Sequence, residues 1–191
     1  MAALIGSTSL FSAALGLQAP WHVVDVRFDQ GQGRLDLQVG FQRGTRFSCP
    51  HCGAAEQGVH DTLERRWRHL NFFQYQAYLQ AKVPRVRCSA CGKTSQVAVP
   101  WARAGSGFTL LMEALLVTLC QAMPVRQVAQ LLAVSDMRVW RTLDHYVDQA
   151  RAQEDFSGVS CIGLDETAAR RGHDYISLFH DLNAGRLLFA C

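Results

Sequence analysis

Two short cysteine motifs constrain the fold of this 191-residue chain more than any other feature. Each motif separates two cysteines by two residues and ends in glycine: Cys49-Pro-His-Cys52-Gly53 and Cys88-Ser-Ala-Cys91-Gly92. A Cys-x-x-Cys turn aims two thiolates at one point, and the glycine permits the tight backbone turn that follows. Two such turns supply the four sulfurs of a tetrahedral zinc site. We therefore expect a structural Zn²⁺ held by Cys49, Cys52, Cys88 and Cys91.

Other roles for these cysteines stay open as alternatives: a redox pair, free thiols, or a site in which His51 replaces one sulfur. The chain has seven cysteines, an odd number, and no basic residue near its start that would mark a secretory signal. We therefore expect a cytoplasmic protein, where paired cysteines are more often metal ligands than disulfides. The 35 residues between the motifs leave room for a β-hairpin, as in a zinc ribbon, and within them Phe72–Val86 is expected to be a strand. The isolated Cys120, Cys161 and Cys191 are predicted to be small core residues.

Positive charge is concentrated around these motifs. The net charge is only +3, but residues 43–103 hold ten basic and three acidic side chains. A basic block in a nearly neutral chain indicates contact with a polyanion, and a solvated basic face is the alternative. The candidate contacts to the DNA backbone in this block are five arginines, three of them within two positions of Trp67: Arg65, Arg66, Arg68, Arg85 and Arg87.

The pattern of the whole chain predicts an α+β protein with four consecutive domains. Residues 1–42 are expected to form a short helix and a β-hairpin, 43–103 a zinc ribbon, 104–150 a helix-turn-helix, and 151–191 a small set of strands. Pro100 and Gly105-Ser-Gly107 predict a linker. The longest apolar stretch is interrupted by polar residues and is too short to span a membrane.

Residues 108–147 change to helical periodicity. In the first helix, one apolar side is expected to face the core: Leu110, Leu111, Ala114, Leu115, Thr118 and Leu119. Pro124–Tyr146 has the spacing of a helix-turn-helix, packed through Val128 and Ala129. In its last helix, Arg138 and Arg141 are expected to point outward, where they can reach base edges or phosphates in a major groove. A plain bundle of short helices is the alternative.

The last segment predicts three strands, at Cys161–Asp165, Tyr175–Leu182 and Arg186–Ala190. Asp165 ends the first of them, which looks buried. An aspartate in that place is usually a turn or cap residue. Asp181 precedes the turn at residues 183–185, so we expect it to have a structural role there.

The order of these parts resembles the bacterial insertion-sequence transposases that carry an N-terminal zinc ribbon, a helix-turn-helix and a DDE catalytic core. The matching stretches are Cys49-Pro-His-Cys-Gly53, Arg66-Trp-Arg-His-Leu70, Val86-Arg-Cys-Ser-Ala-Cys91, Val128-Ala-Gln-Leu-Leu-Ala-Val-Ser135, and Gly163-Leu-Asp-Glu166 with Arg171-Gly-His-Asp-Tyr175. The resemblance covers nearly the whole chain. Its motifs are individually short, and their order and spacing are specific.

The resemblance implies the start of an RNase H-like core, with Asp165 as the first catalytic carboxylate. In that family three carboxylates hold two divalent metals, for which Mg²⁺ is the expected ion, and the reaction cleaves phosphodiesters and transfers strands. The implied partner is double-stranded DNA at transposon ends. The resemblance also implies a homo-oligomer, because these enzymes generally work as multimers on paired ends.

The chain departs from the family at its end. It stops at Cys191, before the positions of the second and third catalytic acids. We therefore expect a truncated transposase that binds zinc and DNA and lacks strand transfer on its own; whether it is an enzyme stays open. The alternative is a non-enzymatic zinc-ribbon and helix-turn-helix DNA-binding regulator, in which Asp165 has no chemical role. A zinc-ribbon module for protein interaction is a third, weaker hypothesis.

Overall fold

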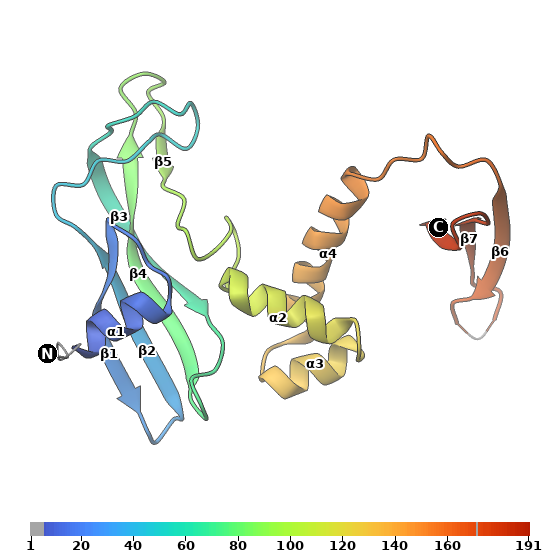
Figure 1. Ribbon diagram of the computed structural model, residues 1–191, viewed down its shortest axis with the longest axis horizontal. Coiled ribbons are helices and arrows are strands. Elements are labelled where there is room, and N and C mark those ends of the chain that lie inside the picture. Colours follow the sequence, from blue (N-terminus) through green and yellow to red (C-terminus); the bar gives the residue numbers. More distant parts are fainter. Residues whose placement is uncertain (1–5, 171) are drawn as a thin grey trace, which may run out of the picture. The chain divides into compact units, whose positions relative to one another are not determined.

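The computed structural model describes residues 6–170 and 172–191 (Figure 1). Arg171, part of one of the family-like stretches, lies outside these residues. The chain divides into two compact units, of which the first ends at Thr142 and the second begins at Leu143. The elements of the first unit, with the last helix continuing into the second, are α1 (Ser7–Ala14), β1 (Trp21–Asp29), β2 (Arg34–Phe41), β3 (Val59–Arg68), β4 (Gln76–Arg87), β5 (Thr94–Gln96), α2 (Leu110–Cys120), α3 (Val125–Leu132) and α4 (Asp136–Ala152).

One five-stranded sheet contains both the N-terminal hairpin and the strands that follow the first cysteine motif. Its order is β1-β2-β4-β3, with β5 paired to β4. The hairpin β1–β2 is antiparallel, as its alternating sequence predicted. The parallel pairing of β2 with β4, from Arg34 opposite Gln76 to Val39 opposite Ala81, joins the hairpin to the zinc-ribbon strands.

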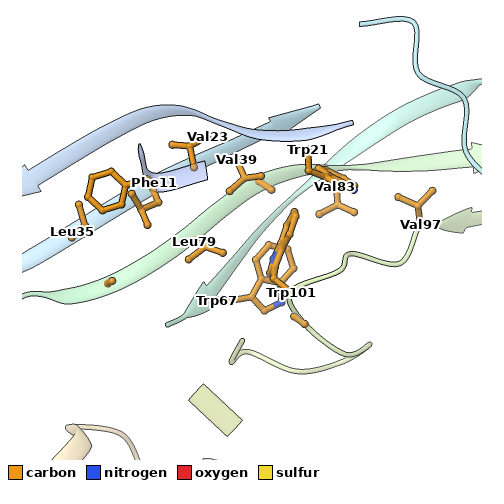
Figure 2. Packing of buried hydrophobic residues seen from close by; sticks show 14 of the residues in the cluster. Phe11, Trp21, Val23, Leu35, Val39, Trp67, Leu79, Val83, Val97 and Trp101 are labelled. Carbon is orange, nitrogen blue, oxygen red and sulfur yellow. The ribbon is translucent and has the colours of Figure 1, made fainter. Parts of the chain in front are cut away.

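One face of this sheet carries the hydrophobic core of the first unit (Figure 2). Alternate residues of β2 and β4 point into it because side chains along a strand alternate between faces. They are Leu35, Leu37, Val39, Ala77, Leu79, Ala81 and Val83. Phe11 of α1 packs over this face. The ring of Trp101 lies edge-on to Trp21 and Trp67, with centroids 5.0 Å and 5.5 Å away.

Strand β3 was not predicted as a separate strand, and β4 begins later than expected. The sequence indicated strand character from Phe72, but the backbone turns there before β4 starts at Gln76. Phe73 has a φ of 52°, and the amides and carbonyls of Phe72 and Tyr75 bond to each other. Phe72, Phe73 and Tyr75 therefore belong to the turn between β3 and β4.

The buried side of α2 differs from the side predicted. Met112, Glu113 and Leu116 are buried, whereas Leu111, expected in the core, is 55% exposed. The inward side of this helix was predicted from the positions of apolar residues alone. The helix instead faces inward through Glu113, because its carboxylate accepts hydrogen bonds from Ser106 and Arg103.

The second unit holds a three-stranded antiparallel sheet in the order β6 (Ile162–Ala168), β7 (Tyr175–Asp181) and β8 (Arg186–Ala190). The three predicted strands are therefore present. The first of them is not buried: Leu164 is 65% exposed. Cys161 and Cys191 are exposed as well, and Cys120 in α2 is only partly buried, so the core positions predicted for these cysteines are wrong.

Candidate metal centre and nucleic-acid interface

The four motif cysteines converge at one end of the first sheet. Their sulfur atoms all lie within 4.8 Å of one another. The sulfur of Cys49 lies 3.8 Å from that of Cys91, and the sulfur of Cys52 lies 3.5 Å from that of Cys88. A tetrahedral site with Zn–S bonds of about 2.3 Å has sulfur–sulfur edges of about 3.8 Å. The donor set and its spacing therefore fit structural Zn²⁺.

Both cysteine motifs fold into the same tight turn. The amide of Gly53 donates to the carbonyl of Cys49 at 2.9 Å, and the amide of Gly92 donates to the carbonyl of Cys88 at 3.0 Å. The two glycines have φ values of +75° and +71°, a conformation that residues with a Cβ rarely adopt. Glycine at these two positions is thus what lets each motif close around the sulfurs.

The local electrostatics favour ionisation of the Cys88 thiol but oppose ionisation of all four cysteines at once. The backbone amide of Cys91 is the largest influence that lowers the pKa of the Cys88 thiol to about 7. The amide of Ala54 acts in the same direction on Cys52, yet the neighbouring Cys88 and other motif thiols raise the pKa of Cys52 to about 12. Close thiolates repel one another. A bound dication offsets this repulsion and allows all four sulfurs to ionise.

Two contacts that the sequence did not reveal tie the motifs together. The buried Gln57 accepts a hydrogen bond from the amide of Ser89 at 2.9 Å through its side-chain oxygen. The ammonium of Lys93 lies 2.6 Å from Nε2 of His51. His51 is not one of the four converging ligands. No spacing rule signals such contacts, since each joins residues more than 30 positions apart.

The predicted helix-turn-helix is present as α3 and the start of α4. Residues 133–135 join the two helices, and Ala133 closes α3 in the left-handed conformation, with φ 51° and ψ 49°. The amide of Val134 donates to the carbonyl of Ala129 at 3.0 Å. Val128 and Ala129 are buried, as predicted. A three-residue turn between two helices with a packed inner face is the geometry of this DNA-binding motif.

Five of the seven arginines proposed to contact DNA keep surface-accessible side chains. Arg65, Arg66 and Arg87 on the sheet and Arg141 on α4 are exposed. Arg85 is part-exposed and forms an ion pair with Asp61, the guanidinium holding the pKa of that carboxyl below its usual range. Most of the predicted basic surface is thus available to a polyanion.

The remaining two arginines differ from their expected outward positions. Arg68 is 2% exposed, and its guanidinium donates to the carbonyl of Ala77 at 3.3 Å. Arg138 lies over the ring of Phe108, 3.9 Å from the centroid, and donates to the carbonyl of Gly107 at 3.0 Å. Burial lowers the pKa of both guanidinium groups. In this structure they make internal contacts where DNA contacts were predicted.

Sequence reasoning also missed an arginine cluster around Tyr78 in β4. The guanidinium carbons of Arg34, Arg66 and Arg68 lie 4.5, 5.5 and 5.4 Å from the centre of its ring. Arg34 belongs to the N-terminal hairpin, and the parallel pairing of β2 with β4 brings it here. The cluster could not be found by spacing, because its members come from three strands.

Asp165 lies on β6, opposite Leu178 of β7, and is exposed. Its carboxylate accepts a hydrogen bond from the amide of Glu166 at 2.9 Å. Within residues 6–170 and 172–191, the four cysteines form the one set of three or more potential ligands that converges, so Asp165 belongs to no such set. Asp181 accepts from the amides of Asn183 and Ala184, which is the structural role predicted for it.

Comparisons with known proteins match the same two regions. Residues 45–91 match the family described as the zinc-finger of transposase IS204/IS1001/IS1096/IS1165. Residues 97–147 match the helix-turn-helix domain of transposase family ISL3. No solved structure matches the chain. In the part of the chain that the structure describes, no helix combines the length and apolar character needed to cross a membrane.

Similar proteins extend the match beyond these regions. The transposase for insertion sequence element IS1557 of Mycobacterium tuberculosis is 31% identical over 95% of this chain and 42% of its own length. The transposase for insertion sequence element IS1001 of Bordetella parapertussis is 30% identical over 70% of this chain and 33% of its own length. The chain thus spans about two fifths of the IS1557 relative. Through its zinc-finger and helix-turn-helix regions, the chain belongs to the ISL3 family of insertion-sequence transposases.

Proposed function

We propose that this chain binds double-stranded DNA at the ends of an insertion sequence, with α4 in the major groove and the arginines of the sheet on the phosphate backbone. The observation that carries the proposal is the pairing of a helix-turn-helix with a four-cysteine centre on one basic unit. Arg141 is the proposed groove contact. Arg65, Arg66, Arg85 and Arg87 are the proposed backbone contacts.

The surface charges support this division of roles. Phosphate contacts hold a protein on duplex DNA without reading its sequence, while side chains near the start of a recognition helix reach base edges. Arg141 lies in the second turn of α4 and is exposed. The sheet arginines lie on β3 and β4, and β4 ends directly before Cys88 of the second cysteine motif. Zinc is therefore proposed to act on DNA binding indirectly, through the fold of the sheet.

For the C-terminal unit we propose the start of an RNase H-like core, with Asp165 as one carboxylate of a site for metal-dependent phosphodiester cleavage and strand transfer. The antiparallel order β6-β7-β8 and the place of Asp165 on the first of these strands support this proposal. Divalent ions such as Mg²⁺ supply an activated nucleophile and stabilise the leaving oxygen when bound. The carboxylate of Asp165 would hold one of them. Because the described residues offer it no converging partners, the 191-residue chain alone is proposed to be inactive in strand transfer.

Among the described residues Asp165 belongs to no converging set of ligands, and this observation also favours a second candidate function, a non-enzymatic DNA-binding regulator. In that case Asp165 has no chemical role, and DNA binding by the first unit is the whole activity. An Asp165→Asn variant separates the two when a fragment of the catalytic core that lacks its own counterpart of Asp165 is supplied in trans. Activity that is indifferent to the substitution supports the regulator.

DNA binding is tested by fluorescence anisotropy with a labelled duplex that carries the terminal sequence of the encoding element, against a shuffled duplex of the same composition. We expect tighter binding to the terminal sequence and an affinity that falls as salt rises, by a slope of about 0.9 per phosphate contacted. Replacing Arg141 with Ala should reduce the preference for the terminal sequence. Equal, salt-insensitive binding to both duplexes would overturn the proposal.

A further inference from the structure

We propose that residues 101–109 form a rigid joint that fixes the helix-turn-helix on the zinc-binding sheet, and that Arg138 is a positioning residue of this joint. The sequence predicted a linker here, because Gly105 and Gly107 lie in this stretch. For its consequence on DNA, the inference rests on the proposed function. The rigid connection between the sheet and the helices does not depend on that function.

The backbone of the joint extends the sheet. The amide of Arg68, at the end of β3, donates to the carbonyl of Gly107 at 2.9 Å, and the amide of Thr109 donates to the carbonyl of Arg68 at 3.0 Å. Phe108 thereby forms a parallel bridge to β3. The amide of Leu110 donates to the carbonyl of Trp101 at 2.8 Å. The first residues of α2 are therefore bonded to the strand and to the core segment.

A buried carboxylate closes the joint from the side of α2. Glu113 is 0% exposed. Its side chain accepts a hydrogen bond from the hydroxyl of Ser106 at 2.6 Å and forms an ion pair with Arg103 at 3.0 Å. Both partners lie in the expected linker, one on each side of Gly105. A buried acceptor with charged and hydroxyl donors fixes the path of the segment that supplies those donors.

Two further contacts hold the joint from the sheet and from α4. The ring of His69 bonds through Nδ1 to the hydroxyl of Thr109 at 2.8 Å, and that hydroxyl caps α2 by accepting from the amide of Met112. Arg138 reaches from α4 to the ring of Phe108 and the carbonyl of Gly107. The same two residues, Gly107 and Phe108, thus contact β3 on one side and α4 on the other.

These contacts explain why Arg138, an arginine of the proposed recognition helix, packs against the joint. An arginine stacked on an aromatic ring and bonded to a carbonyl sets the direction of the helix that carries it. Arg138 therefore acts through Arg141, which lies three residues later on the same helix and is exposed. With these joint contacts formed, the DNA contacts proposed for the sheet and those proposed for α4 keep a fixed spacing along the duplex.

The test uses residual dipolar couplings of the ¹⁵N-labelled, zinc-loaded full chain without DNA. One alignment tensor is expected to fit the amides of β1–β4 together with those of α2 and α3. A Glu113→Ala/Arg138→Ala double variant is expected to need two tensors, and Arg141→Ala, on the same helix but outside the joint, is expected to need one. A wild-type chain that needs two tensors overturns the inference, even if the double variant does not fold. A folded double variant that keeps one tensor also overturns it.

A DNA arm distinguishes positioning from direct contact. With the terminal-sequence duplex, Arg138→Ala is expected to weaken binding about tenfold while the salt slope stays unchanged, and Arg66→Ala to lower the slope by about 1. Arg138→Lys, which keeps the charge but loses the planar stack, should bind as weakly as Arg138→Ala. Full rescue by lysine, or a slope lowered by Arg138→Ala, assigns a phosphate contact and overturns the positioning role. If wild type does not bind DNA, the proposed function fails and the tensor result still decides on the joint.

Discussion

The guanidinium of Arg138 lies over the ring of Phe108, with its central carbon 3.9 Å from the ring centroid. This places an arginine of the helix-turn-helix against the residue that bridges to strand β3. The pair connects the two halves of the proposed DNA-binding unit. The stability of that unit is therefore expected to depend on the aromatic ring.

Replacing Phe108 with Leu should lower the free energy of unfolding of the first unit by about 1–2 kcal/mol. The substitution leaves a small cavity and removes the ring face under Arg138. Thermal and denaturant unfolding of the zinc-loaded chain measure the change. Phe73→Leu is the matched control, because Phe73 is 81% exposed, and it should change the free energy by less than about 0.5 kcal/mol. Equal effects of the two substitutions would contradict the packing described for Phe108.

Replacing Glu113 with Ala should destabilise the first unit by about 3 kcal/mol. The change removes a fully buried carboxylate and leaves Arg103 and Ser106 without this acceptor. Denaturant unfolding provides the measurement. The control is Glu64→Ala, since Glu64 pairs with Lys82 at 3.8 Å and both side chains are exposed. An exposed pair contributes about 0–1 kcal/mol, so similar losses for the two variants would refute the assigned role of Glu113.

The stability of the chain should depend on the protonation of His69. Burial, and secondarily the neighbouring Arg68, lower the pKa of His69 to about 4. Because an unfolded histidine titrates near 6.5, the unfolded chain binds the extra proton first as the pH falls. The contribution of His69 is thus fully present above pH 6.5 and is lost as the pH falls to about 4. Its size is at most about 3 kcal/mol.

The measurement compares the free energy of unfolding of wild type and of a His69→Gln variant between pH 7 and pH 4. The cysteine thiolates also titrate with pH, so only the difference between the two curves reports on His69. That difference should shrink steadily as the pH falls from about 6.5. A constant difference across this range would show that His69 is not held neutral by its surroundings.

In the second unit, substitution of Asp181 should cost more stability than substitution of Asp165. Asp181 accepts from two backbone amides and pairs with Arg186 at 3.7 Å, whereas Asp165 is exposed on β6. Asp181→Ala is therefore expected to cost about 1–2 kcal/mol, and Asp165→Asn less than about 0.5 kcal/mol. Hydrogen exchange of the β7 and β8 amides measures both. A larger loss for Asp165→Asn would assign that residue a structural role.

The sequence was most informative where the pattern is local. The alternation of apolar residues predicted β1 and β2, and the spacing of Val128 and Ala129 predicted the packed side of α3. The convergence of the four cysteines followed from the chemistry of thiolates and the glycine that ends each motif. The strands, the helix side and each cysteine turn depend on neighbours within a few positions of the chain, and the two distant turns were joined by the preference of one ion for four thiolates.

The features that escaped prediction depend on contacts between distant segments. Periodicity could not show that β2 pairs with β4 in parallel, which brings Arg34 to Tyr78. A charged residue such as Glu113 counts as outward in any apolar pattern, yet two donors from the preceding segment bury it. For the same reason Arg68 looked like a surface arginine until its carbonyl partners were known.

One ion joining the two cysteine motifs is the central feature of the proposed DNA-binding unit. The direct test is the zinc content of the purified, folded chain, measured by mass spectrometry for wild type, Cys88→Ser and the control Cys120→Ser. We predict about one zinc per chain for wild type and for Cys120→Ser, and a loss of zinc together with unfolding of the first sheet for Cys88→Ser. A folded wild-type chain without zinc, or full zinc content in Cys88→Ser, would contradict the account.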